Sequence, residues 1–402
     1  MSDICFLNDL DVSGKRVLVR VDFNVPLDAE ARVIDTTRIE AAVPTIRYLL
    51  GKGVRVVLAS HLGRPKGRPD AQYSLEPVAT ELARILSCPV TFLSDCVGED
   101  VERATHNLNE GGVILLQNLR FHEGEEKNDP DFCRSLSRLA DAYVNDAFGT
   151  AHRAHASTTG VAELMKARAA GFLLAREIEF LGKKTADPER PFVVILGGAK
   201  VSDKVTVIES LLRTADTILI GGAMTYTFKL AQGETVGHSL SEPDKIEVAR
   251  TALESAAAQG VRFLLPADNL ITDALDFDAL RVGDTKVVSG DIPDGWEGID
   301  IGPRTIARYE KEITEAHTIL WNGPMGIFEI EASSRGTFAV AAAVAANRKA
   351  ISIIGGGDSV SAINQSGFAD QVTFMSTGGG ASLEFLEGRV LPGVAALGKL
   401  KP

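Results

Sequence analysis

Polar and basic residues follow several short apolar runs in the first half of the sequence. The residues that could take part in chemistry there are Asp22, Phe23, Asn24, Arg38, His61, Leu62, Gly63, Arg64, Arg120 and Arg153. Guanidinium groups offer planar forks that match carboxylate and phosphate oxygens, so several arginines at one site suit a small polyanion. Any one of them alone is more simply a surface side chain, but their recurrence favours an anion site. His61 would be a further donor, and Asp22 and Asn24 would hold a hydroxyl group or orient the arginines.

Glycine-rich segments take the corresponding places in the second half. They are Gly197-Gly198-Ala199-Lys200, Gly221-Gly222-Ala223, Asn322-Gly323-Pro324, Gly355-Gly356-Gly357-Asp358 and Gly378-Gly379-Gly380. Glycine lets the backbone approach a phosphate closely, and a helix that starts after it presents free N–H groups. One triplet is more often a tight turn, but the repetition favours a nucleotide site. Asp358 beside such a loop is a plausible Mg²⁺ ligand, directly or through water.

Two lysines follow the first of these glycine segments. Lys200 and Lys204 are four residues apart, so a helix that begins near Ala199 would place both on one face. From that face both ammonium groups could reach the oxygens of a transferring phosphate. The alternative is a solvated helix face with Asp203 nearby, and the preceding strand and Gly-Gly turn count against it.

These residues need strands that bring them to common edges. About ten β-branched runs, each followed by a segment able to form a helix, indicate parallel strands buried on both faces. That is more than the eight strands of a barrel, so we predict an α/β fold of two doubly wound, Rossmann-like parallel-sheet domains joined by a connecting helix. The expected parts are residues 1–171, a connecting helix over 172–185, residues 186–387, and a tail over 388–402 that could pack back on the first domain. The segment 172–185 could instead be one more crossover helix.

Composition restricts the function further. The 402 residues include 42 Lys and Arg against 54 Asp and Glu, a net charge of −12, which argues against a nucleic-acid partner. The start of the chain does not resemble a leader peptide, and no apolar run is long enough for a membrane span. The four cysteines lie in the first third without a CxxC pair, so neither a zinc site nor a disulfide framework is expected. We therefore expect a folded cytoplasmic protein.

Motif absences separate the remaining classes. Neither GxxxxGK[ST] nor GxGxxG occurs, so a P-loop and a dinucleotide fingerprint are both missing. A nicotinamide dehydrogenase would share the two-domain layout, but it would need that fingerprint and has no use for the arginine-lined edge. A nucleotide-binding protein without catalytic activity would keep the glycine loops and have no use for Arg38 together with Lys200.

The motifs resemble those of the phosphoglycerate kinase family and come in the family's order. They are VRVDFNVP at 19–26, the region of Arg38, SHLGRP at 60–65, LRFHEGEE at 119–126, NDAFGTAHRAHAS at 145–157, LGGAKVSDK at 196–204, WNGPMGIFE at 321–329, GGGDS at 355–359 and STGGGAS at 376–382. They span nearly the whole chain. Only Ile327 and Ser359 depart from the family pattern, standing where related chains often carry Val and Thr.

The resemblance implies reversible phosphoryl transfer between 1,3-bisphosphoglycerate and ADP, giving 3-phosphoglycerate and Mg-ATP. In the first domain it implies that the segments Asp22-Phe23-Asn24 and His61-Leu62-Gly63-Arg64, with Arg120 and Arg153, bind the glycerate. Arg38 would reach the reacting carboxyl group and the moving phosphoryl group. A monomer is expected from the same resemblance. Closure about the connecting helix is expected for a different reason, because the arginine-lined and glycine-lined edges lie in different domains and must approach to contact one phosphoryl group.

In the second domain the resemblance assigns the nucleotide. Lys204 would contact the nucleotide phosphates, and Lys200 the transferred group. Gly222, Gly298 and Glu329 would lie at the nucleoside, Gly356, Gly357, Asp358 and Ser359 at the phosphates, and Asp358 would hold Mg²⁺. The helix after Gly379 would add positive charge at the transferring group.

Overall fold

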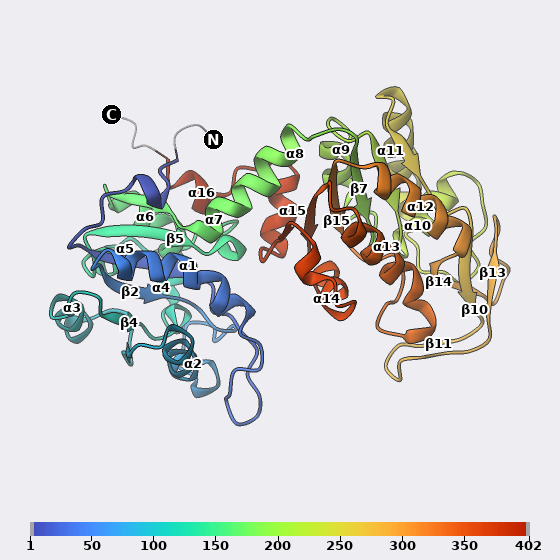
Figure 1. Cartoon of the computed structure of the whole chain (residues 1–402). Coiled ribbons are helices and arrows are strands. Elements are labelled where there is room, and N and C mark those ends of the chain that lie inside the picture. The colour runs from blue at the N-terminus through green and yellow to red at the C-terminus, as the bar shows by residue number, and fades with distance from the viewer. Residues whose placement is uncertain (1–3, 399–402) are drawn as a thin grey trace. The chain divides into compact units, whose positions relative to one another are not determined.

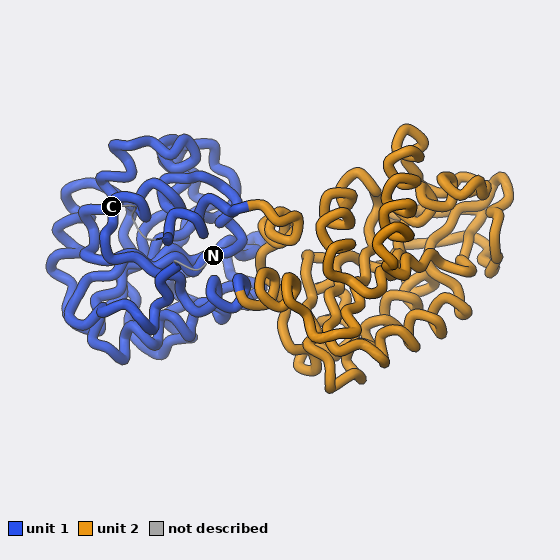
Figure 2. Tube along the Cα trace, turned by 90° about the horizontal axis from the view of Figure 1, so that it is seen from above, with its two compact units in different colours: residues 1–178, 390–402 blue, residues 179–389 orange. Residues whose placement is uncertain are grey.

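The computed structural model describes residues 4–398, and it divides them into two compact units (Figure 2). One unit consists of the described residues up to Ile178 together with the segment from Val390 onward, and the other is Glu179–Arg389. The chain first passes from one unit to the other in a helical run, made of α7 (Phe172–Glu177), a π-helical stretch (Ile178–Lys183) and α8 (Lys184–Ala186) (Figure 1), and it returns after Arg389. The expected connecting segment, residues 172–185, lies within this run. Of the expected tail, residues 388–402, the part from 399 onward lies outside the described residues.

The first unit contains a six-stranded parallel sheet in the order β3-β4-β2-β1-β5-β6. Its strands are β1 (Arg16–Val21), β2 (Arg55–Ala59), β3 (Val90–Phe92), β4 (Val113–Leu115), β5 (Ala142–Asp146) and β6 (Arg168–Ala170). The chain runs outward from β1 in one direction through β2 and in the other through β5. The carboxyl ends of β1 and β5 therefore flank the point where the strand order reverses, which is where open α/β sheets bind ligands.

Helices cover this sheet because both of its faces are apolar. The helices are α1 (Thr37–Gly51), α2 (Glu76–Leu86), α3 (Glu99–His106), α4 (Glu123–Glu126), α5 (Pro130–Ser137), α6 (Val161–Leu164) and, from the far end of the chain, α16 (Pro392–Ala395). Ile39, Ala42, Ile46 and Leu49 recur at helical spacing in α1 and pack in one core with alternate residues of β1, beginning at Val17. The segment from Val390 joins this unit through the bridge of Ile4 with Gly398.

The second unit contains a six-stranded parallel sheet in the order β17-β16-β15-β7-β8-β9. Its strands are β7 (Phe192–Leu196), β8 (Thr217–Ile220), β9 (Arg262–Leu264), β15 (Thr318–Asn322), β16 (Ile351–Gly355) and β17 (Phe374–Met375). The flanking helices are α9 (Val205–Leu211), α10 (Met224–Ala231), α11 (Ile246–Ala258), α12 (Pro303–Glu315), α13 (Arg335–Ala346), α14 (Gly357–Gln365) and α15 (Gly380–Leu386). Counted along the chain, the strand order is the 3-2-1-4-5-6 of a Rossmann fold. The predicted α/β class with two doubly wound sheets is confirmed.

Antiparallel strands in the second unit were not anticipated. A three-stranded sheet, β13-β10-β14, consists of Asn269–Thr272 (β10), Thr285–Val288 (β13) and Glu297–Ile301 (β14), and a hairpin consists of β11 (Leu275–Asp276) and β12 (Arg281–Val282). The parallel edge strands β3 and β6 were also not anticipated. Most of these strands have two to four residues, and several are partly exposed or carry polar or small residues. They therefore do not form the longer buried apolar runs by which the central strands are recognised.

Two further properties concern the helices and the cysteines. Among the described residues, no helix combines the length and the apolar composition that crossing a bilayer requires. Cys5, Cys88, Cys96 and Cys133 are all free thiols.

Candidate active site

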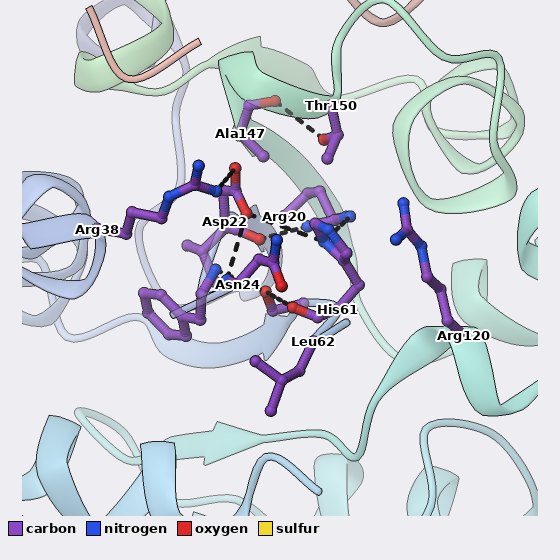
Figure 3. A network of polar contacts seen from close by, with 12 residues as sticks. Arg20, Asp22, Asn24, Arg38, His61, Leu62, Arg120, Ala147 and Thr150 are labelled. Atoms are coloured by element: carbon purple, nitrogen blue, oxygen red, sulfur yellow. Dashed lines mark hydrogen bonds and ion pairs between the residues drawn. The ribbon is translucent and has the colours of Figure 1, made fainter. Parts of the chain in front are cut away.

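The carboxyl ends of β1 and β2 bring the predicted anion-binding residues together in the first unit (Figure 3). Arg38 Nη1 donates to Asp22 Oδ2 at 2.7 Å, and the backbone N–H of Gly63 donates to Asn24 Oδ1 at 2.8 Å. Asp22 Oδ1 lies 3.9 Å from His61 Nδ1. Asp22 and Asn24 therefore fix an arginine and a loop backbone in the free protein. We call the strand ends that carry the predicted anion-binding residues, including Asp22, Asn24, Arg38, His61, Arg64, Arg120 and Arg153, the Arg/His edge.

Two predicted residues of the Arg/His edge point elsewhere. The side chains of Phe23 and Leu62 are buried in the hydrophobic core of the unit, so only their backbone groups can face a ligand. The backbone N–H of Phe23 donates to Ser60 Oγ at 2.8 Å, which fixes the turn after β1. Gly63 has a φ of +60°, and a Cβ atom there would lie 2.3 Å from the ring of Tyr73. These positions shape the edge and do not supply side-chain donors.

Arg120 is the most deeply buried of the predicted arginines, with 3% of its surface exposed. Its Nη1 donates to the carbonyl of Gly63 at 2.8 Å, and its Nε lies 3.3 Å from Glu126. Its Nη2 is buried without a hydrogen-bond partner among the described residues. Burial, together with the nearby charge of Arg153, lowers the pKa of Arg120 from 12.5 to about 10. A buried donor without a partner and under such repulsion favours an anionic ligand at this point.

The other two predicted arginines are more accessible. Arg153 is half-buried, and its Nε lies 3.2 Å from the Nε2 atom of His152. Arg64 is exposed. Burial lowers the pKa of His61 well below its usual range, and the charges of Arg120, Arg38 and Arg153 act in the same direction. The edge is therefore strongly positive within an acidic protein.

Arg20, which lies within β1 and is 1% exposed, is a residue of the site that was not predicted. Its Nη2 lies 3.2 Å from His61 Nδ1, and its Nε donates to Ser157 Oγ at 2.8 Å. The apolar run around it indicates only the interior of a strand. An arginine inside such a run is itself a signal, because a buried guanidinium needs partners.

In the second unit a polar cavity of about 430 Å³ lies at the carboxyl ends of β7, β15 and β16. Its lining includes Lys200, Lys204, Gly356, Gly357, Asp358, Ser359 and Gly379, all of them predicted, together with Asn322. β7 and β15 are the strands at which the order of this sheet reverses. The glycine segments therefore meet where the fold provides a ligand site.

The predicted helix across Lys200 and Lys204 is wrong. α9 begins only at Val205, and the residues before it form turns. The Gly197-Gly198 segment explains this, because Gly198 has a φ of +129° and the backbone leaves β7 without entering a helix. Both lysines nevertheless line the polar cavity, Lys200 exposed and Lys204 mostly covered.

Lys204 is held inside the polar cavity. Its Nζ donates to Asn322 Oδ1, and burial lowers its pKa from 10.5 to about 8, against the opposing charges of Asp203 and Asp358. The Nδ2 atom of Asn322 is buried without a hydrogen-bond partner among the described residues. An ammonium group and an amide donor thus face a space that suits phosphate oxygens.

Two loops complete the cavity. Gly356 has a φ of +84° between β16 and α14, a conformation that glycine adopts without strain. The buried hydroxyl of Ser359 accepts a hydrogen bond from the backbone N–H of Gly323 at 2.5 Å, so this side chain joins the loops after β15 and β16. Asp358 is exposed in the first turn of α14. Gly379, with a φ of +52°, precedes the seven-residue helix α15.

An apolar cavity of about 310 Å³ adjoins the polar one and shares Gly198, Ala199 and Asp358 with it. The predicted residues Gly222, Gly298 and Glu329 line it, together with Tyr226, Leu240, Leu275, Phe277, Pro324 and Ile327. Gly298 is required by close packing, because a Cβ atom there would lie 1.8 Å from the Tyr226 hydroxyl. The apolar walls were missed because several lie outside the parallel sheet, notably on the β11–β12 hairpin. Their chemistry suits a flat, largely apolar ring system.

Comparisons with known proteins show which family this chain resembles over nearly its whole length. The family model described as phosphoglycerate kinase matches residues 7–389. The phosphoglycerate kinase of Chlorobaculum tepidum is 54% identical, over 97% of this chain and 98% of that protein, and the enzyme of Moorella thermoacetica is 56% identical, with the same coverage. The structure of phosphoglycerate kinase from Coxiella burnetii is similar, with a TM-score of 0.89 and 38% identity over 98% of each chain. The enzyme from Pyrococcus horikoshii has a TM-score of 0.82 and 33% identity, again over 98% of each chain.

Proposed function

The chain belongs to the phosphoglycerate kinase family, and from this we propose where its substrates bind and how the phosphoryl group moves between them. The reaction is the reversible transfer of a phosphoryl group from 1,3-bisphosphoglycerate to ADP, which gives 3-phosphoglycerate and ATP in glycolysis. One observation supports the assignment of sites. An edge rich in arginine and histidine belongs to one unit, and two adjoining cavities lined by glycine and apolar residues belong to the other.

We assign the glycerate ligand to the Arg/His edge. Arg64, Arg120 and Arg153 bind its distal phosphate, with His61 as a further donor, and the unpartnered Nη2 of Arg120 supports this assignment. Asp22 and Asn24 bind the hydroxyl group and the carboxylate end. Arg38, held by Asp22 at 2.7 Å, reaches from there toward the reacting carboxyl group.

We assign the nucleotide to the two cavities of the second unit. The adenine and ribose occupy the apolar cavity, beside Gly222, Gly298 and Glu329. The mostly apolar lining of this cavity supports the assignment. The phosphates enter the polar cavity, where Gly356, Gly357 and Ser359 border them. Lys204 contacts the phosphates, and its lowered pKa supports this assignment, because an anion beside it would favour the charged form.

The donor set also fits Mg²⁺. Mg²⁺ prefers one or two carboxylates together with phosphate oxygens and water, and Asp358 is the carboxylate that lines both cavities. When bound there, the ion would neutralise charge on the nucleotide phosphates. The phosphates would then be oriented by Lys204, Lys200 and the first turn of α14.

Catalysis in this proposal needs no general base, because the attacking carboxylate or ADP oxygen is already anionic. The contribution of the chain is in-line positioning and stabilisation of charge on the equatorial oxygens of the phosphoryl group. Arg38 supplies charge from the first unit, and Lys200 and the backbone around Gly379 supply it from the second. Lys204 remains bound to the nucleotide throughout.

Ligand-driven closure of the two units follows from the assignment of one substrate to each unit. Arg38 and Lys200 belong to different units, so both can contact one phosphoryl group only when the two sites face each other. Closure about the helical run 172–186 would also exclude water, which hydrolyses an acyl phosphate readily. We further propose a cytoplasmic monomer, in keeping with the four free cysteines.

Binding measurements on matched variants test the assignment. Arg120→Met should lose most of its affinity for 3-phosphoglycerate and keep its affinity for ADP, and Lys204→Met should do the reverse. Arg47→Met is the control, since it removes an exposed arginine of α1 that does not belong to the Arg/His edge. If Arg120→Met bound ADP poorly and 3-phosphoglycerate normally, the two sites would have to be exchanged.

A further inference from the structure

A chain of buried hydrogen bonds lies behind the Arg/His edge and runs from Glu125 to His61. Glu125 accepts from Ser157 twice, from its backbone N–H at 3.0 Å and from its hydroxyl at 2.6 Å. Arg20 Nε donates to the same hydroxyl oxygen at 2.8 Å, and Arg20 Nη2 lies 3.2 Å from His61 Nδ1. The exposed fractions are 0% for Glu125, 1% for Ser157 and Arg20, and 4% for His61. Figure 3 shows Arg20 and His61 at the edge.

The direction of each hydrogen bond is fixed by chemistry. The Ser157 hydroxyl donates to Glu125, so its oxygen is free to accept from Arg20. A guanidinium group has donors only, so Nδ1 of His61 must be the acceptor of the next bond. A ring whose Nδ1 accepts is neutral and carries its proton on Nε2. The chain therefore selects one tautomer of His61.

The surroundings of His61 keep its ring neutral. Burial lowers the pKa of His61 well below its usual range, and the charges of Arg20 from β1, Arg120, Arg38 from α1 and Arg153 act in the same direction. The carboxylate of Asp22 lies 3.9 Å from Nδ1 with the opposite charge, but Asp22 is paired with Arg38. The ring is thus a neutral donor among cations.

We propose that Glu125 is a positioning residue that, through Ser157, orients Arg20 and so holds His61 as the neutral Nε2–H tautomer. This rests on the proposed function, in which His61 binds the phosphoglycerate. Glu125 touches no substrate in this scheme. It fixes which ring nitrogen is a donor, and it keeps Arg20 turned toward the edge.

A carboxylate suits this position better than an amide. Glu125 accepts both hydrogen bonds from Ser157, one at each oxygen. In Glu125→Gln one of these contacts would place the amide NH₂ against a donor. The Ser157 hydroxyl proton would then have to turn away from residue 125, and the lone pair that now faces Arg20 would be redirected. Ser157→Ala removes the link itself and leaves the Arg20 Nε–H without its acceptor.

The test uses the nitrogen NMR signals of His61 in the free full-length protein. Wild type should show the Nε2–H tautomer at neutral pH. Ser157→Ala and Glu125→Gln should show a mixture of tautomers or the Nδ1–H form, and Ser157→Thr, which keeps the hydroxyl, should resemble wild type. The control is Thr159→Val in the same π-helical segment (Ala156–Gly160), whose hydroxyl has no partner in the described structure. It should leave His61 unchanged.

Kinetics supply the second readout. In Ser157→Ala, KM for 3-phosphoglycerate should rise about tenfold, as for the loss of one hydrogen bond to a charged group, while KM for ATP stays constant. Ser157→Thr should restore it. A wild-type His61 that is charged or carries its proton on Nδ1, or a tautomer unmoved by Ser157→Ala, would overturn the proposal. A tautomer that changes as expected, with KM for 3-phosphoglycerate unchanged, would uphold the chain of hydrogen bonds and contradict the substrate site at His61.

Discussion

Replacing Lys204 by methionine should make the stability difference between wild type and variant depend on pH. Burial lowers the pKa of Lys204 in the folded protein from 10.5 to about 8. The unfolded chain therefore holds more protons than the folded protein between these two values, so the stability of wild type rises with pH across this window. The methionine side chain of the variant cannot titrate, so the variant lacks this contribution.

The expected size follows from the two pKa values. At pH 7 the folded protein keeps Lys204 mostly charged against its burial, and at pH 9.5 it has released that proton while the unfolded chain still holds most of its own. Integrating the difference in bound protons from pH 7 to pH 9.5 gives wild type about 2 kcal/mol relative to Lys204→Met. The hydrogen bond from Lys204 to Asn322 is lost in the variant at both pH values and shifts the whole difference without changing its slope.

Urea unfolding followed by tryptophan fluorescence measures this difference. Both tryptophans, Trp296 and Trp321, belong to the unit that contains Lys204, so the signal reports on that unit. Lys200→Met is the matched control, because Lys200 lines the same cavity but is exposed. Its stability difference from wild type should not change with pH. A difference for Lys204→Met that is equal at pH 7 and pH 9.5 would refute the idea that burial opposes this charge.

Three further predictions concern catalysis, the nucleotide cavity and motion. Arg38→Ala should lower kcat by about 10²–10³-fold, as for the loss of one electrostatic stabiliser, and Arg38→Lys should recover only part of this activity. Steady-state kinetics measure both variants. A normal kcat with only a raised KM would assign Arg38 to binding alone. Gly298→Ala should weaken ADP binding in calorimetry, because the added Cβ would lie 1.8 Å from the Tyr226 hydroxyl and must displace a wall of the apolar cavity. The overpacking should also destabilise the protein by about 1–3 kcal/mol, and an unchanged ADP affinity would remove Gly298 from the nucleotide site. Small-angle scattering should show compaction only when 3-phosphoglycerate and a non-reacting Mg-ATP analogue are both present, since each ligand alone contacts one unit; identical profiles for the free and ternary states would contradict closure.

Much of the fold could be predicted because its central strands are buried on both faces. β1, β2, β7 and β15 appear in the sequence as largely apolar runs, and the residues after them had to lie at the carboxyl edge of a sheet. This geometry alone gathers the glycine segments around the polar cavity. The antiparallel strands β10 to β14 escaped the same reasoning, because they are short and partly exposed.

The parts of the site that were missed depend on tertiary contacts. Arg20 lies inside a strand, and its role is set by Ser157 and His61, which come from distant parts of the chain. The walls Leu275 and Phe277 carry no chemical signature of their own and matter only because the hairpin borders the cavity. The wrong helix at Lys200 shows the same limit, since i, i+4 spacing predicts a shared face only where a helix forms.

Hydrogen exchange with each ligand alone examines the assignment of one substrate to each unit. With 3-phosphoglycerate, backbone amides at 60–64 and 119–122 should exchange more slowly, and those at 355–359 should not change. With Mg-ADP, protection should appear at 355–359 and around Gly222, and the Arg/His edge should not change. Protection of 355–359 by 3-phosphoglycerate, with none at the Arg/His edge, would contradict the assignment and place the glycerate ligand in the second unit.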